Sequence, residues 1–267
     1  AIQTVPGRYR GLVIHNDGEN FSVGANIGWL LIAMKLRAWF AVRAMQRYGQ
    51  KVFKRLKYAP FPVVAAPSGM ALGGGCEVLL HCSAIQAHAE TYAGLVEAGV
   101  GLVPGWGGCK ELLLRNKASK APPFGPMPPV IKSFETIAMA HVAKSAAQAR
   151  DLGFLRDGDG ITMNRDRLLA DAKAKVLSLA ANYTPPAPPS ISLPGKTAYA
   201  ALMLALDVTV GLALAGVLSG GDTDMTKSVG EDDLLALEAK SFLALARNPA
   251  TVARVAHMIK TGKPLRN

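Results

Sequence analysis

The stretch that decides the fold is Ala71-Leu-Gly-Gly-Gly-Cys-Glu77. Its three consecutive glycines stand directly before a segment that we expect to be helical, from about Cys76 to Cys82. Glycine lets a backbone N–H approach a ligand closely, and the start of a helix directs the positive end of its dipole at that ligand. The stretch therefore indicates either a site for a developing negative charge, such as an oxyanion, or a tight turn from strand to helix.

Two carboxylates accompany this glycine run. Glu77 would lie in the first turn of the helix, where it is either a favourable charge at a helix start or an acid or base beside the anion site. Glu97 follows in a stretch of apolar and small residues from Ala93 to Gly107. A carboxylate in such surroundings is poorly explained as solvated surface, and burial would suit it to proton transfer. The pair suggests acid–base chemistry at one anion site.

The periodicity of the chain predicts an α/β protein. Short buried strands are expected at 11–14, 62–66 and 84–87, and one long helix at 27–56. The glycine-rich segment 67–75 is expected to be a loop. Strands alternate with helices in the first half and helices dominate the second, which is typical of an α/β core with a helical C-terminal region.

Composition excludes several classes of protein. Of the 267 residues half are apolar and 18% are charged, so the chain is not intrinsically disordered. Three cysteines are too few for a disulfide scaffold, and we expect a reducing, cytoplasmic location. The long apolar run Thr197–Gly221 is interrupted by Asp207, which argues against a membrane span.

The net charge of +11 indicates an anionic partner without choosing one. Nucleic acid, an anionic membrane and a phosphorylated small ligand are all compatible with it. Much of the charge falls within or beside the helix expected at 27–56, either as a solvated face or as a footprint for polyphosphate or nucleic acid; the residues are Lys35, Arg37, Arg43, Arg47, Lys51, Lys54, Arg55 and Lys57. We expect no nucleic-acid partner, because no nucleic-acid-binding motif accompanies this helix.

Several motifs in order resemble a known family. They are Phe21-Ser-Val-Gly-Ala-Asn-Ile27, the glycine run ending at Glu77, Glu97, and Val103-Pro-Gly-Trp-Gly-Gly108. Together they resemble the crotonase (enoyl-CoA hydratase) superfamily over residues 11–155. The resemblance implies the ClpP/crotonase-like core, a ββα superhelix. Segments 159–167 and 260–267 are similar to the hydratase half of bacterial fusions with 3-hydroxyacyl-CoA dehydrogenase.

The resemblance also implies roles for single residues. The backbone N–H groups of Ala25 and Gly74 would form the oxyanion hole for a thioester carbonyl. Glu77 would hold and activate water, and Glu97 would deliver a proton to the α-carbon. The neighbouring positions are expected to bind substrate: Gly24, Asn26, Ile27, Ala71, Gly73, Pro104 and Gly105. No metal is implied.

The implied reaction is the addition of water to a trans-2-enoyl-CoA, which gives a 3-hydroxyacyl-CoA in fatty-acid β-oxidation. The acyl-CoA thioester is the substrate, and NAD would be needed only by a dehydrogenase domain, for which this chain has no dinucleotide fingerprint. The chain would form a homo-oligomer or pack with an N-terminal dehydrogenase domain. An enoyl-CoA isomerase and a non-catalytic acyl-CoA-binding fragment remain alternatives.

The sequence departs from the family in several places. Fewer residues than usual precede Phe21, so we expect an N-terminal truncation with the first strands missing. The junction Leu206–Asp207 lacks a polar turn, and residues are expected to be missing there. Trp106 and Cys109 stand where smaller or hydroxylated residues are usual, which could alter the pocket. We expect a crotonase-like core at 1–183 and a helical region at 184–267.

Other sites are suggested more weakly. Gly221–Ser228 approaches a phosphate-binding P-loop, but Thr226 replaces its second glycine. Cys76, His81, Cys82 and His88 could suggest a metal site, but their spacing fits no standard zinc pattern. Cys76 has no identifiable base partner for a nucleophilic role.

Overall fold

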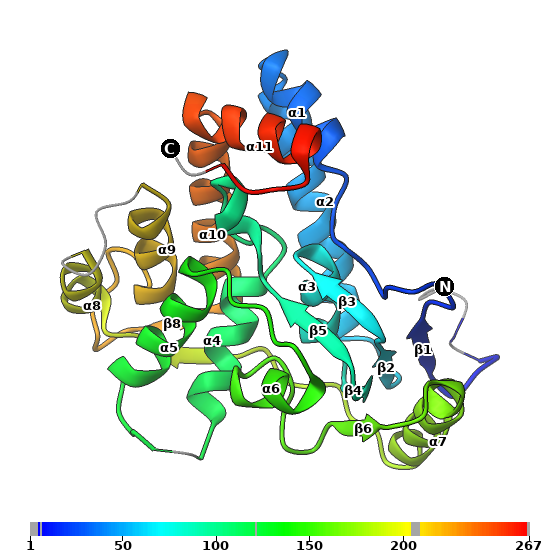
Figure 1. Ribbon diagram of the computed structural model, residues 1–267. Coiled ribbons are helices and arrows are strands. Elements are labelled where there is room, and N and C mark those ends of the chain that lie inside the picture. The colour runs from blue at the N-terminus through cyan, green and yellow to red at the C-terminus, as the bar shows by residue number, and fades with distance from the viewer. Residues whose placement is uncertain (1–4, 6, 121, 204–208, 266–267) are drawn as a thin grey trace. The chain divides into compact units, whose positions relative to one another are not determined.

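The computed structural model describes residues 5, 7–120, 122–203 and 209–265 (Figure 1). The chain divides into two compact units that interleave along the sequence. The first unit comprises 1–24, 51–94 and 142–187, and the second comprises 25–50, 95–141 and 188–267. The domain boundary expected at 183/184 stays a prediction, and the junction Leu206–Asp207 lies outside the described residues.

A parallel sheet forms the centre of the first unit. Its strands are β1 (Leu12–His15), β2 (Val63–Ala66), β4 (Ala84–His88) and β6 (Gly160–Thr162), in the order β1-β2-β4-β6 (Figure 1). All three pairings are parallel. Strand β2 reads Val-Val-Ala-Ala and is buried throughout, as expected for a strand covered on both faces of a parallel sheet. The expected strands at 11–14, 62–66 and 84–87 are therefore confirmed.

Helix α7 (Leu168–Ala180) packs against β1, β2 and β4. The short helix η2 (Arg165–Arg167) leads into it, and α6 (Ala146–Asp151) lies earlier in the same unit. The apolar side chains of α7 and of the sheet form one core cluster, whose buried members are Val64, Ala66, Ala84, Leu168, Ala172 and Val176.

A second, two-stranded parallel sheet leads to the glycine run. Strand β3 (Gly69–Leu72) pairs with β5 (Thr91–Gly94), and an isolated bridge joins Ser22 to Ala71. Helix α3 (Gly74–His81) follows β3 directly. The prediction of a loop at 67–75 is thus wrong. Strand β3 forms because β5, which is distant in sequence, supplies its hydrogen-bond partners, and the small residues of β3 do not indicate a strand by themselves.

The long helix expected at 27–56 is two helices, α1 (Ile27–Lys35) and α2 (Trp39–Lys57). The chain turns at Arg37, whose φ is 53°, and the N–H of Ala38 donates to the carbonyl oxygen of Ala33. A left-handed residue ends the helical hydrogen-bond pattern. The apolar spacing runs through this turn, which is why periodicity missed the break.

Helices dominate the second unit, as expected for the C-terminal part. They are η1 (Glu97–Val100), α4 (Gly108–Ala118), α5 (Met127–Ala138), α8 (Gly195–Met203), α9 (Thr209–Ser219), α10 (Glu231–Ala246) and α11 (Pro249–Thr261), besides α1 and the first part of α2. Two short antiparallel strands, β7 (Ser190–Ser192) and β8 (Ser228–Gly230), were not expected. Each has only three residues, too few for a pattern to emerge.

The apolar run 197–221 includes most of α8, all of α9 and residues outside the described part of the chain. None of the helices described in the structure is long and apolar enough to cross a membrane.

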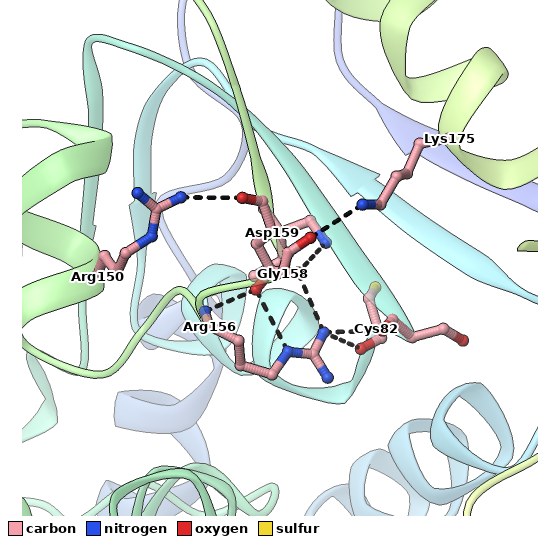
Figure 2. Close-up of polar contacts among 8 residues, drawn as sticks. Cys82, Arg150, Arg156, Gly158, Asp159 and Lys175 are labelled. Atoms are coloured by element: carbon pink, nitrogen blue, oxygen red, sulfur yellow. Dashed lines mark hydrogen bonds and ion pairs between the residues drawn. The ribbon is translucent and has the colours of Figure 1, made fainter. Parts of the chain in front are cut away.

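Asp159 organises the loop that precedes β6 (Figure 2). Its carboxylate accepts hydrogen bonds from the N–H groups of Ile85 and Arg156, both at 2.8 Å, and from Nε of Arg156 at 3.3 Å. The backbone carbonyls of this loop are also held: Arg150 donates to that of Asp159 and Lys175 to that of Gly158, both at 2.9 Å. This buried carboxylate therefore fixes the loop against the start of β4.

Replacing Asp159 by Ala is expected to lower the free energy of unfolding by about 2–3 kcal/mol, because the N–H of Ile85 loses a charged acceptor in a buried site. Chemical denaturation measures the loss. Asp157→Ala is the matched control, because Asp157 is exposed. Equal stabilities of the two variants would contradict this role of Asp159.

Candidate active site

The glycine run forms the junction between β3 and α3 in the first unit. Gly73 has a φ of 53°, and its N–H donates to the carbonyl oxygen of Gly94 at 2.8 Å. Gly74 is the first residue of α3, where backbone N–H groups have no partner within the helix. A Cβ on Gly75 would lie 2.4 Å from the carbonyl oxygen of Ser22, so close packing requires glycine there. Both interpretations of the run, tight turn and available N–H donor, are compatible with this geometry.

Glu77 lies in the first turn of α3, as expected, and is 2% exposed. Its N–H donates to the carbonyl oxygen of Gly73 at 3.0 Å. One turn later, Nδ1 of His81 lies 2.7 Å from the carbonyl oxygen of Glu77, and the His81 ring stacks on Phe53. The carboxylate of Glu77 is therefore carried on a short helix that is fixed within the core of the first unit.

Glu97 belongs to the second unit, where it is the first residue of η1. The residue is half-buried, and the Oε2 atom of its carboxylate is shielded from solvent. The left-handed Gly101, with a φ of 81°, ends η1, and its carbonyl oxygen accepts a hydrogen bond from Oγ1 of Thr251 at 3.0 Å. Helix α11 thus holds the far end of the turn that carries Glu97.

The first motif loop enters α1 through Asn26. The Asn26 side chain caps the helix by accepting from the N–H groups of Gly28 at 3.0 Å and Trp29 at 3.2 Å. Ile27 is the first residue of α1, and Ala25 lies before the cap. The carboxamide oxygen of Asn26, a candidate for substrate binding, is therefore already engaged in fixing the helix start.

Pro104 and Gly105 are both buried in the segment that leads to α4. Nε2 of Gln50, on α2, donates to the carbonyl oxygens of Gly105 and of Leu235, each at 3.0 Å. A Cβ on Gly105 would lie 3.0 Å from the Phe242 ring. The backbone at Gly105 is thus held by two helices of the second unit.

Trp106 packs against α2 at Gly49. A Cβ on Gly49 would lie 2.2 Å from Nε1 of the Trp106 indole, closer than real Cβ contacts allow. The large side chain at 106, which departs from the family pattern, is therefore accommodated by a glycine on the facing helix. Sequence spacing could not reveal this pair, because the two residues are far apart in the chain.

We expect Gly49→Ala to lower the free energy of unfolding by about 1–3 kcal/mol, because the new methyl group must displace the indole. The direction of this change in stability is informative, because replacing Gly by Ala in a helix interior otherwise stabilises a protein by about 1 kcal/mol. Thermal unfolding tests it, with Gly158→Ala as the control, because nothing lies within 4 Å of a Cβ there. A more stable Gly49→Ala variant would refute the packing argument.

The N-terminus of helix α4 is capped by a carboxylate that could not be predicted from the sequence. Glu238, fully buried on α10, accepts from the N–H groups of Gly107 and Lys110, both at 2.8 Å. An anion at a helix start satisfies unpaired N–H groups and opposes the helix dipole. Glu238 follows its partners by more than a hundred residues, and nothing local to it signals this contact.

The weaker candidates have other surroundings. Among the described residues, no three His, Cys, Asp or Glu side chains could hold a metal ion together, and the three cysteines are buried and form no disulfide bond. In the P-loop-like segment, the backbone N–H and hydroxyl of Thr226 hydrogen-bond to Asp224 and hold the pKa of that carboxyl below its ordinary value. That segment turns on itself and leads into β8.

The candidate residues fall into two groups. In the first unit Gly24 lies against the glycine run, since a Cβ on it would be 3.4 Å from the nitrogen of Gly74 and 3.2 Å from the carbonyl oxygen of Leu72. With them belong Ala71, Gly73 and Glu77. The second unit carries Ala25, Asn26, Ile27, Glu97, Pro104 and Gly105.

Comparison with solved structures identifies the fold class. The structure aligns with a TM-score of 0.63 to an enoyl-CoA hydratase from Bacillus halodurans, at 16% identity, covering 94% of this chain and 82% of that one. An enoyl-CoA hydratase/isomerase from Mycobacterium paratuberculosis aligns at 0.59 and 21% identity, covering 95% of this chain and 82% of that one. The protein has the crotonase fold with its α/β core.

Sequence comparison agrees with the resemblance drawn from the motifs. Residues 5–121 match the model of the enoyl-CoA hydratase/isomerase family, which confirms the resemblance drawn from the motifs. A Bacillus subtilis protein named "Probable 3-hydroxyacyl-CoA dehydrogenase" is 42% identical over 100% of this chain and 35% of its own length. A crotonyl-CoA hydratase of Syntrophomonas wolfei is 38% identical over 38% of each chain. The chain thus spans little more than a third of the length of these curated relatives.

Proposed function

We propose that this chain adds water to a trans-2-enoyl-CoA and gives a 3-hydroxyacyl-CoA, as the hydratase part of a longer protein of fatty-acid β-oxidation. The observation that carries the proposal is the presence of both glutamates. Glu77 follows the glycine run on α3, and Glu97 opens η1. The match to the family over residues 5–121 covers both positions.

In the proposed mechanism, the N–H groups of Ala25 and Gly74 polarise the thioester carbonyl, which makes the β-carbon electrophilic. Glu77 holds the attacking water, and Glu97 delivers a proton to the α-carbon. The enolate-like charge formed in between is stabilised by the two N–H donors, each worth about 3 kcal/mol by analogy with measured oxyanion holes. The position of Gly74 at the start of α3 supports this role, because N–H groups there lack helical partners.

The shielding of the Glu97 Oε2 atom is compatible with proton transfer by that residue, because bulk water is kept away from this part of the carboxylate. Glu77 is almost completely buried on a short helix, which suits a group that must position one water molecule. We propose that the remaining motif residues bind substrate; they are Gly24, Asn26, Ile27, Ala71, Gly73, Pro104 and Gly105.

The longer protein would also oxidise the hydration product with NAD. The name of the Bacillus subtilis relative supports this part. That protein is named a probable 3-hydroxyacyl-CoA dehydrogenase, and the present chain spans 35% of its length. We propose that the dehydrogenase domain and its NAD belong to that longer protein, and that the longer protein is cytoplasmic. For the present chain, we propose acyl-CoA as the ligand.

The test is loss of the enoyl-thioester absorbance when this chain is mixed with crotonyl-CoA. Hydration with release of 3-hydroxybutyryl-CoA is the expected result. Isomerisation is the nearest alternative, because a single glutamate can move a proton between carbons. Turnover of a 3-enoyl-CoA, without turnover of crotonyl-CoA, would decide for the isomerase. Binding of crotonyl-CoA with no turnover of either thioester would decide for the acyl-CoA-binding alternative.

A further inference from the structure

A basic cavity of about 360 Å³ lies between α2 and α10 in the second unit. Helix α2 contributes Arg43, Gln46 and Arg47, and α10 with its C-terminal cap contributes Lys240 and Arg247. All of these residues belong to the second unit, and none of them is among the motif residues assigned to the hydration reaction.

The charges that line this cavity all have one sign. Its four charged residues are Arg43, Arg47, Lys240 and Arg247, and no acidic side chain lines it. None of the four forms an ion pair within the described part of the chain, where the observed pairs involve other groups. All four residues are exposed. Four cations around one concave surface raise the local concentration of anions there.

Arg247 is also held in position. Its guanidinium lies over the Trp39 ring, 5.3 Å from the ring centroid. Stacking of this kind restricts the side chain while leaving its N–H donors available. At least one cation of the cavity therefore has a preferred orientation, although the residue is exposed.

Gln46 provides an independent sign of a ligand. It is 2% exposed and lines the cavity, and its Nε2 atom has no hydrogen-bond partner among the described residues. Buried donors are normally paired, so an unpaired one requires an explanation. One turn further along α2, Gln50 uses its own Nε2 for two hydrogen bonds at 3.0 Å. The Nε2 atom is itself shielded from solvent, and a Cβ on Gly105 would lie 3.2 Å from it, so a ligand in the cavity takes this donor only when the carboxamide turns toward it.

We propose that this cavity binds the phosphate groups of an anionic ligand. A phosphate or diphosphate group carries several charges and several acceptor oxygens, which match paired guanidinium groups and a carboxamide donor. The phosphates could belong to the CoA part of a thioester substrate or to a separate phosphate compound. The binding chemistry is the same in both cases and does not depend on the proposed hydration reaction.

Isothermal titration calorimetry of this chain with inorganic pyrophosphate at low ionic strength tests the site. Arg47→Gln and Lys240→Gln are each expected to weaken binding about tenfold or more, as befits the loss of one charge-assisted hydrogen bond. Lys51→Gln is the matched control, because it removes an equal charge from an exposed position of the same helix outside the cavity. No binding, or an equal loss in the control, would overturn the proposal.

Gln46→Leu separates a binding role from a structural one. The substitution removes an unpaired buried amide at similar volume, so the melting temperature is expected to hold or rise. Pyrophosphate affinity is expected to fall about fivefold or more, because the ligand loses a hydrogen bond. Unchanged affinity in a stable variant would contradict the part given to Gln46.

Titration with coenzyme A identifies the source of the phosphates. If coenzyme A binds and Arg47→Gln and Lys240→Gln weaken it, the cavity holds the phosphates of the substrate. If the variants weaken pyrophosphate alone, the ligand is a separate phosphate compound. Both titrations measure binding and do not require turnover. A chain without hydratase activity could therefore still bind phosphate in this cavity, and an active hydratase could lack this phosphate site.

Discussion

Glu97→Gln is expected to lower the rate of crotonyl-CoA hydration by about 10²–10⁴-fold, the usual contribution of a positioned general acid or base. The substitution keeps the size of the side chain and removes only its ability to transfer a proton. Glu77→Gln is expected to produce a loss of the same order, because the neutral amide cannot accept a proton from the attacking water. Initial rates at saturating crotonyl-CoA measure both effects on kcat.

The control for these variants is Glu90→Gln, which makes the same chemical change at an exposed position of the first unit. It should leave kcat unchanged. Full hydration activity in Glu97→Gln, together with loss of activity in Glu77→Gln, would contradict the two-carboxylate mechanism. Retention of activity in both would remove the glutamates from the chemistry altogether.

The residues of the candidate site were accessible from sequence because their signals are local. Glycine is required at the junction into α3, since Gly73 adopts a positive φ and a Cβ on Gly75 would meet the backbone of Ser22. Glu77 follows at a fixed helical position, so its place in the first turn could be predicted. The strands of the first sheet were likewise predictable, because β2 is an uninterrupted buried apolar run.

Features that depend on contacts distant in sequence could not be predicted. Strand β3 exists because β5 pairs with it, and its own four residues look like a loop. The glycine at 49 is explained only by the Trp106 indole that packs on it. Glu238 caps α4 from α10, and a carboxylate on a helix carries no local sign of such a role. Tertiary packing decides each of these, and periodicity reports only local structure.

The largest effect on stability is expected at Lys110, an α4 residue with a fully buried side chain. Its Nζ atom lies 2.5 Å from a carboxylate oxygen of Glu111 and 2.5 Å from one of Glu231, the first residue of α10. Burial alone would lower the pKa of Lys110, but the two carboxylates and their hydrogen bonds more than offset it and raise the pKa above its ordinary 10.5. The ammonium therefore stays charged and joins two helices.

Lys110→Met is expected to lower the free energy of unfolding by about 3–5 kcal/mol, because it leaves two buried carboxylates without their cation. Equilibrium unfolding in urea at neutral pH measures this loss. Lys120→Met removes a charge from an exposed position shortly after α4 and should change the free energy by less than about 0.5 kcal/mol. A triple variant that also carries Glu111→Gln and Glu231→Gln should recover much of the loss, since neither of these two positions then holds a buried charge that has lost the Lys110 cation.

The pH dependence gives a second readout of the same group. Because the pKa of Lys110 is higher in the folded state than in the unfolded state, its contribution is fully present below about 10.5 and declines as pH rises through the folded value. The stability difference between the unaltered protein and Lys110→Met should therefore be constant from neutral pH to about pH 10 and shrink above it. A difference that is already shrinking between pH 7 and pH 9 would show that the buried ammonium loses its proton early, and would contradict the ion triad as the reason for its burial.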